Sequence, residues 1–291
     1  MFKATRIITT SRYFRNVYAF EEAAVNFAAG IALGIPLGLV AYKLKYLDKR
    51  ATAVSILLSG LYFTGGVGLY LPSLAFFFSS SLATRLAYAS KKSKGAAERE
   101  EGRSASQVIG AGLVAAVLTA MYGILADHRD KLLVPTLAVL ASSNADTWAA
   151  EVGALYRGKP RLITRPGIEV EPGTSGGVTP LGALGAVSGS AVVGLVALLE
   201  SALGILPLSA ALIPQIVLLG WLGEVFDSVI GATLQVKYYC PRCRTLTDKP
   251  VHLCGEKTVR VGGLSWVTNE ITNLLATGIV ALLGLVLQTL L

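Results

Sequence analysis

Long apolar segments, separated by shorter polar ones, run through most of this chain. A helix needs about 20 apolar residues to cross roughly 30 Å of hydrocarbon. The pattern predicts eight such helices, at residues 24–42, 51–71, 73–90, 107–126, 132–155, 181–204, 210–236 and 266–291. Because almost no polar residues separate the second from the third, we expect a tight hairpin at 71–73. The pattern therefore predicts an all-α polytopic integral membrane bundle of about seven or eight transmembrane helices.

Composition supports this class. The chain has 291 residues, of which 53% are hydrophobic and only 15% charged, whereas soluble domains carry about 25% charged residues. No soluble domain of ordinary size fits between the apolar segments, so we expect one transmembrane domain over residues 24–291. Residues 1–23 are basic but do not follow the order of a signal peptide. They suit a helix lying along the membrane surface or a frayed tail.

The basic residues are distributed unevenly about the predicted spans. If the spans alternate in direction, the loops 43–50, 91–106, 156–180 and 237–263 share one side and hold 19 Lys and Arg, against six on the other side. Positively charged loops face the cytoplasm, so we expect a multi-pass protein of the cell membrane with these loops inside. The net charge of +8 suits anionic lipid or phosphorylated ligands, and nothing in the sequence suggests nucleic acid.

Seven ionisable residues lie within the apolar segments, and six of them are acidic. A charge at the centre of a membrane helix costs roughly 2.5–3.5 kcal/mol on the most permissive scale, so such groups usually pair, bind a cation or handle a polar substrate. This excess of acids predicts a membrane interior that holds a metal ion. The seven are Arg85, Asp146, Glu151, Glu200, Glu224, Asp227 and Glu270.

The fifth span is interrupted by the polar stretch 142–148. Its residue types are those that cap helices, which predicts a discontinuous helix lining a cavity. If the helix is instead continuous, Asn144, Thr147 and Glu151 share one face and Asp146 points well away from it. A polar seam between two helices is a further alternative.

Two polar loops carry residues suited to phosphate. The loop 91–104 is the densest charge cluster and includes Lys91 and Arg103; it is either a solvated loop or a phosphate-binding one. In the loop 156–180, basic residues precede the sequence GTSGG at 173–177. Glycines let backbone N–H groups converge on phosphate, although loop flexibility explains them equally well. The phosphate-binding residues we expect in this loop are Lys159, Arg161, Arg165, Thr174, Ser175, Gly176 and Gly177.

Span seven places Glu224, Asp227 and Gln235 on one helix stripe. Two carboxylates three residues apart can share a divalent cation, share a proton, or pair with Arg85. Mg²⁺ needs few protein carboxylates when substrate phosphates complete its shell, which favours it here.

All three cysteines lie in the loop 237–263, together with one of the two histidines. Cys240 and Cys243 have a knuckle spacing, and His252 and Cys254 follow, so three thiolates and one imidazole could form a tetrahedral zinc site. Four protein ligands leave no open position, so zinc here would be structural. Chance proximity in sequence is the alternative.

Four motifs in this order resemble the domain-of-unknown-function-92 family, which includes animal transmembrane protein 19 and plant phytyl-phosphate kinases. They are SNADTWAAEVG at 143–153, GKPRLIT at 158–164, GTSGGVT at 173–179 and DSVIGATLQ at 227–235. The stretch from Asp146 to Lys159 is also similar to a pattern of CTP-dependent polyprenol kinases. Two departures are notable: Asn144-Ala145 stands where many relatives have Gly before the Asp, and the Cys/His loop is absent from the animal and plant versions.

The resemblance implies a kinase that converts a prenyl monophosphate of phytyl or geranylgeranyl type to the diphosphate, with a CTP-like nucleoside triphosphate and Mg²⁺. Asp146, Glu151 and Asp227, with Glu224, would hold the metal. Asn144, Thr147, Gln235, Lys91, Arg103 and the loop residues named above would bind substrate and phosphate.

Two other functions fit the same residues. Acids at membrane depth beside a broken helix are typical of ion-coupled carriers. The region around Asp227 and Lys237 is faintly similar to cytidylyltransferases that make CDP-lipids. The sequence leaves open the prenyl chain length, the nucleotide base and the oligomeric state.

Overall fold

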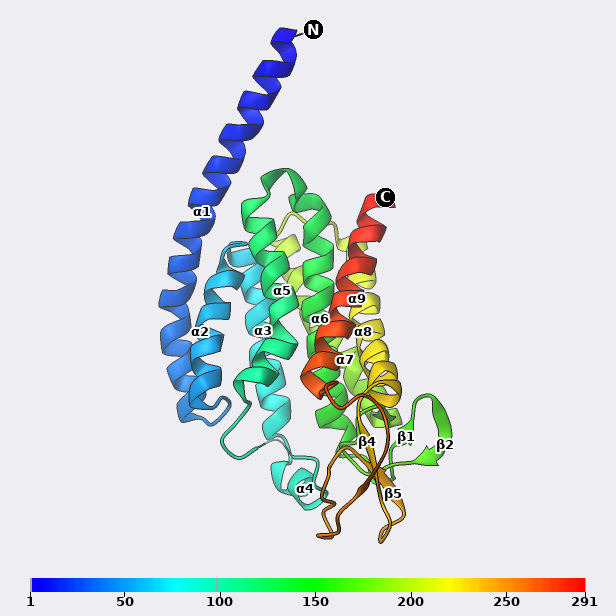
Figure 1. Ribbon diagram of the computed structural model, residues 1–291. Helices are drawn as coiled ribbons and strands as arrows, with labels where there is room; N and C mark the ends of the chain where they lie inside the picture. The colour runs from blue at the N-terminus through cyan, green and yellow to red at the C-terminus, as the bar shows by residue number, and fades with distance from the viewer. Residues whose placement is uncertain (1, 98, 291) are drawn as a thin grey trace.

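The computed structural model describes residues 2–97 and 99–290 (Figure 1). Long helices pack side by side into a bundle, with short strands gathered at one end of it. The long helices are α1 (Phe2–Lys43), α2 (Lys49–Phe63), α3 (Val67–Arg85), α5 (Ala105–Ile124), α6 (Arg129–Gly153), α7 (Pro180–Ala202), α8 (Ile213–Thr233) and α9 (Asn269–Leu290). The short ones are α4 (Tyr88–Ser93) and the 3₁₀ turns η1 (Ala126–His128) and η2 (Ala210–Leu212).

The expectation of an all-α polytopic membrane bundle is confirmed. Six helical segments of the described chain are long and apolar enough to cross a membrane, namely Val17–Lys43, α3, α5, α7, Ala210–Thr233 and α9. Two further helices complete the bundle. Helix α2 has only 15 residues, and α6 is buried along most of its length inside the bundle.

The position of the first hairpin corrects the sequence prediction. We expected the turn at 71–73, but α2 and α3 are joined at 64–66, and Pro72 lies inside α3. Gly66 has a φ of +77°, a conformation that residues with a Cβ rarely adopt. The glycine therefore decides the turn, whereas Pro72 costs α3 a single backbone hydrogen bond.

The predicted break in the fifth span is also wrong. Helix α6 runs without interruption for 25 residues through the polar stretch 142–148. Its polar side chains bond neighbouring helices rather than its own backbone: Ser143 Oγ donates to Ala111 O at 2.6 Å, and Asn144 Nδ2 donates to Gly189 O at 2.7 Å. Capping residue types thus serve here as contacts between helices, which leaves the helix continuous.

The polar loops fold into two small antiparallel sheets, which the sequence did not predict. One contains β1 (Arg161–Leu162), β2 (Arg165–Glu169) and β3 (Gly177–Val178) in the order β2-β1-β3; the other contains β4 (Lys237–Cys240), β5 (Thr245–Thr247) and β6 (Val259–Gly262) in the order β5-β4-β6. Both lie at the same end of the bundle as α4 and the α1–α2 connection (Figure 1). The four basic loops therefore share one end, as the alternation of spans required.

The basic N-terminal segment is continuous with the first membrane helix. Helix α1 extends well beyond the rest of the bundle at the end opposite the sheets (Figure 1). Arg15 Nη1 lies 3.1 Å from Asp127 Oδ1, and Arg129 Nη2 lies 3.7 Å from Glu22 Oε2. From Arg15 onward the segment is therefore tied to the α5–α6 connection rather than frayed, and its position along the membrane surface stays a prediction.

Glycines allow α7 and α8 to approach α6 closely. A Cβ built on Gly185 of α7 would lie 2.7 Å from Trp148 O, and one built on Gly223 of α8 would lie 2.6 Å from Ser142 Cβ. Small residues at such contacts are the usual basis of helix packing in membranes, because lipid tails are as apolar as leucine side chains. The position of α6 relative to its neighbours therefore depends on residues without side chains.

This packing predicts that Gly185→Ala destabilises the protein. The added methyl meets backbone atoms of α6 that cannot turn away, and overpacking of this kind costs about 1–3 kcal/mol. The matched control is Gly278→Ala in α9, because a Cβ at Gly278 meets nothing within 4 Å. Thermal unfolding in detergent should show a lower midpoint for Gly185→Ala only; equal midpoints would contradict the packing argument.

Candidate functional site

A polar cavity of about 560 Å³ opens at the end of the bundle that carries the sheets. Its volume lies in the range of about 300–1,000 Å³ that is usual for small-molecule sites. Helices α6, α7 and α8 form its walls, and the loop 172–178 closes one side. Asp146 lies seven residues before the end of α6, or about 10 Å along the helix axis, so the cavity reaches into the bundle.

Four of the predicted acidic residues line this one cavity. They are Asp146 and Glu151 from α6 and Glu224 and Asp227 from α8. The charges of Asp146, Glu224 and Asp227 act on one another, and Asp146 and Asp227 also line a second, smaller cavity together. Carboxylates from two helices separated by some 80 residues of sequence thus line the same cavity.

The loop 173–177, called the glycine loop below, forms another wall of the cavity. Thr174, Ser175, Gly176 and Gly177 all line the cavity. Gly176 has a φ of +77°, and a Cβ there would lie 2.5 Å from Ala232 Cβ on α8. The glycine is therefore required both by the turn and by the close contact with α8, and it holds the loop beside the acids of that helix.

Glu151 differs from the other acids because it has a cationic partner. Lys91 Nζ lies 2.5 Å from Glu151 Oε2 and also donates to Ala83 O at 3.0 Å and Thr84 O at 2.7 Å. These three acceptors use all the N–H groups of an ammonium, and Lys91 is fully buried. The expectation that Lys91 binds phosphate is therefore wrong; it neutralises Glu151 instead.

Asn144 and Thr147 lie away from the cavity, which corrects their predicted role in substrate binding. Asn144 is fully buried; its Oδ1 accepts hydrogen bonds from Ser79 Oγ at 3.0 Å and Ser80 Oγ at 2.8 Å. Thr147 is buried on the same side of α6 and does not line the cavity. Asn144 and Thr147 therefore lie on another side of α6 from Asp146, as expected if the helix is continuous.

The predicted basic phosphate ligands are also displaced from the cavity wall. Lys159, Arg161 and Arg165 are exposed residues of the loop around β1 and β2, and they do not line the cavity. Arg103 donates to Thr84 Oγ1 at 3.2 Å and lines smaller cavities near α3 instead. Gln235 Nε2 donates to Asp248 Oδ2 at 3.3 Å, behind the glycine loop. None of these side chains therefore lines the cavity that contains the acids.

The cavity wall contains polar residues that were not among the predicted site residues. Lys249 lines it and donates to Gly95 O at 3.1 Å. Ser228 also lines it and donates to Glu224 Oε1 at 2.9 Å, and Asn269 contributes from the start of α9. Ser228 lies one residue beyond Asp227 within a recognised motif, so the sequence carried a signal for it. Lys249 follows a strand that periodicity did not reveal.

A buried ion pair lies behind the glycine loop. Lys237 Nζ lies 2.5 Å from Asp248 Oδ1 and donates to Ser175 O at 2.7 Å, while Ser175 N donates to Asp248 Oδ2 at 2.7 Å. Burial lowers the pKa of Lys237 and raises the pKa of Asp248, and in each case the charge of the partner opposes that shift. The pair therefore holds the backbone of Ser175 from both its N–H and its C=O.

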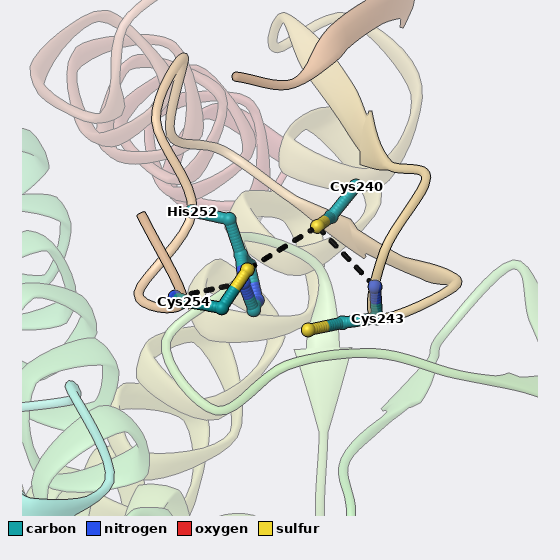
Figure 2. Close-up of side chains that lie close together, drawn as sticks. All are labelled: Cys240, Cys243, His252 and Cys254. Atoms are coloured by element: carbon teal, nitrogen blue, oxygen red, sulfur yellow. Dashed lines mark hydrogen bonds between the residues drawn. The ribbon is translucent and has the colours of Figure 1, made fainter. Parts of the chain in front are cut away.

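The Cys/His residues converge at a separate place in the loop 237–263 (Figure 2). One ligand atom from each of Cys240, Cys243, His252 and Cys254 lies within 4.8 Å of all the others. None of the four lines the polar cavity. The four residues that are grouped in the sequence thus also form a cluster in the structure, and this cluster is separate from the acids of the cavity.

The family model described as Integral membrane protein DUF92 matches residues 32–281. The chain belongs to this family. The match includes α6, the glycine loop, α7 and α8, so the resemblance drawn from four motifs is confirmed.

Curated relatives of this DUF92 protein occur in a plant and in a prokaryote. Protein PGR of Arabidopsis thaliana is 30% identical over 256 residues, which cover 80% of this chain and 85% of the relative. A membrane protein of Methanocaldococcus jannaschii is 32% identical over 176 residues, which cover 60% of this chain and 71% of the relative. No solved structure matches the chain.

The Lys91–Glu151 pair predicts an asymmetric response to mutation. Lys91→Met leaves a buried carboxylate unpaired, which costs about 3–5 kcal/mol, whereas Lys91→Met with Glu151→Gln removes both charges and should recover most of that loss. Unfolding midpoints in detergent measure the effect. Lys92→Met is the control, because Lys92 pairs with Glu100 on the exposed surface, where such pairs contribute little. Equal losses for Lys91→Met and Lys92→Met would refute the buried pair.

Proposed function

We propose that this membrane protein is a prenyl-phosphate kinase, which transfers the terminal phosphoryl group of a nucleoside triphosphate to an isoprenyl monophosphate. The observation that carries the proposal is the convergence of Asp146, Glu224 and Asp227 with the glycine loop on one open cavity. An acidic wall facing a loop of small residues suits a metal-bound polyphosphate. The family resemblance implies the same chemistry.

The donor set of the cavity fits Mg²⁺. Carboxylate oxygens are hard ligands, and Mg²⁺ is usually held by one or two carboxylates together with substrate phosphates. Asp146, Asp227 and Glu224 would supply the protein oxygens, while Glu151 stays paired with Lys91. Bound Mg²⁺ would neutralise the phosphate charge that gathers during transfer.

The remaining residues have positioning roles in the proposed reaction. The N–H groups and hydroxyls of the loop 174–177, with Lys249 beside them, would orient phosphate oxygens in line for transfer. An oxygen of the prenyl phosphate would form the new P–O bond as the bond to the β-phosphate breaks, which releases a nucleoside diphosphate. No strong base is required, because a phosphate monoester is already a nucleophile.

The cavity also suits a substrate anchored in lipid. It opens at the end of the bundle where the basic loops gather, and by the charge rule this is the cytoplasmic face. The isoprenyl tail would remain between helices or in lipid while its phosphate enters the cavity. The ion-coupled carrier is less well supported, because its sequence argument depended on a broken helix and α6 is continuous.

The direct test uses purified protein, Mg²⁺, labelled nucleotide, and phytyl or geranylgeranyl phosphate. We expect prenyl diphosphate with release of a nucleoside diphosphate from at least one donor among CTP, ATP, UTP and GTP. Release of pyrophosphate would instead identify a CDP-lipid-forming enzyme. If no donor yields diphosphate, the proposal is wrong.

Neutral substitutions in the cavity should separate catalysis from folding. Asp146→Asn and Asp227→Asn are each expected to reduce turnover by at least about 100-fold, because removing one electrostatic contact at a reacting centre costs about 10²–10³ in rate. Glu200→Gln is the matched control. Glu200 is equally an acid buried in a membrane helix, but it lies near the other end of α7 and outside the cavity. Comparable losses for all three variants would point to a structural effect.

A further inference from the structure

The segment 237–263 is too small to be stable through its own hydrophobic core. Its strands β4, β5 and β6 are short, and large apolar side chains on it, Val251, Leu253, Val259 and Val261, are exposed. Domains of this size usually need disulfides, a metal or partner surfaces to hold their shape. The residues that are buried here include Cys240 and His252, which are metal-ligand types.

The distances among these residues fit a tetrahedral metal site rather than a disulfide. Cys240 Sγ and Cys254 Sγ are 3.8 Å apart, whereas a disulfide bond measures about 2.05 Å. Two thiolates on one zinc ion, each about 2.3 Å from it, are separated by close to that observed distance at a tetrahedral angle. Cys243 N lies 3.5 Å from Cys240 Sγ, as expected where a Cys-x-x-Cys turn folds its amides around a thiolate.

His252 is oriented for the same role. Its Nδ1 lies 3.0 Å from Cys254 Sγ, and its Nε2, which is buried without a hydrogen bond in the described chain, faces Glu171 Oε1 at 3.7 Å. A histidine that binds a metal through one nitrogen commonly points the other at a carboxylate. Glu171 lies two residues before the glycine loop, so the cluster is linked to the cavity wall.

Further contacts join the Cys/His segment to the loops of the cavity. Leu246 O accepts hydrogen bonds from Glu171 N and from Thr174 Oγ1, both at 3.4 Å. The Lys237–Asp248 pair holds the backbone of Ser175. The loop around β4 and β5 therefore contacts the glycine loop at Thr174 and at both backbone polar groups of Ser175.

We propose that Cys240, Cys243, His252 and Cys254 bind one structural Zn²⁺ ion, and that this ion holds the segment 237–263 in the conformation that positions the glycine loop. The site is closed, because four protein ligands complete a tetrahedron. The zinc ion orders the segment, the segment fixes Asp248 and Lys237, and these two residues fix Ser175. Zinc binding itself does not depend on the proposed kinase activity.

Metal content of the full-length protein, purified in detergent without added chelator, tests the first half. We expect about one zinc ion per chain. After replacement of zinc with Co²⁺, thiolate ligands should give charge-transfer absorption in the near ultraviolet together with visible bands of a tetrahedral site. Less than about a tenth of a zinc ion per chain, or cobalt spectra without thiolate bands, would overturn the site.

The chain offers a matched control, since it contains two histidines. His252→Gln should lose zinc, or bind it far more weakly in competition with a colorimetric chelator, whereas His128→Gln should retain it. His128 lies in η1, between α5 and α6. If both variants keep a full complement of zinc and the same affinity, His252 is not a ligand and the proposed site is wrong.

Hydrogen exchange tests the second half, without nucleotide or lipid substrate. Removing zinc should speed amide exchange in the peptide that covers 171–178, while peptides of α6 remain unchanged. Asp248→Asn should speed exchange in the same peptide with zinc still bound, because it weakens the acceptor of the Ser175 N–H. Unchanged exchange at 171–178 after zinc removal would refute the positioning role, whether or not the protein proves to be a kinase.

Discussion

The close contact of α7 and α8 with α6 is the constraint on which the site depends. In a membrane there is no hydrophobic force to bring helices together, so close packing must supply the attraction. Glycines at 185 and 223 permit it here, since a Cβ at either position would overlap atoms of α6. The acids of α6 and α8 can line one cavity only because the two helices meet at this short distance.

The four acids that line the cavity are accommodated in two different ways. Glu151 is neutralised by Lys91, which comes from the short helix α4 and enters the interior from the loop end. Asp146, Glu224 and Asp227 instead face an open cavity, where a cation and polar ligands can reach them. A buried carboxylate without either solution would cost several kcal/mol. This contrast separates the acid that maintains the fold from those suited to bind a metal.

Sequence patterns predicted the bundle well because hydrophobic length is a direct physical requirement of the bilayer. They failed at 142–148, where helix-capping residue types predicted a break, and at 71–73, where two adjoining apolar segments predicted a hairpin. Asn144 resembles a helix cap, yet it bonds Ser79 and Ser80 of another helix. Pro72 resembles a turn residue, yet Gly66 makes the turn. Such partners are distant in sequence, so a single chain read locally carries no trace of them.

The same reasoning explains which site residues could be found from sequence. Acids inside apolar spans stand out because burying them costs much free energy. Four of them line the cavity: Glu151, which pairs with Lys91, and Asp146, Glu224 and Asp227. Basic residues in loops carry no comparable free-energy cost, so the sequence does not indicate which way each side chain points. Lys91, Lys249 and Arg165 looked alike in sequence, but one is buried in an ion pair, one lines the cavity and one is exposed.

The two halves of the cavity are therefore stabilised by different physical means. The acidic wall is fixed by helices that the membrane itself holds upright, so its geometry is set once α6, α7 and α8 pack. The glycine loop lies outside the helices and contains residues that adopt positive φ values, so contacts with other segments must hold its backbone. A loop of that kind keeps one conformation only if something holds its backbone, and the contacts of Asp248 and Lys237 with Ser175 do so. The Cys/His segment supplies such contacts at Ser175, while β1 and α8 lie against the loop at Gly176 and Gly177.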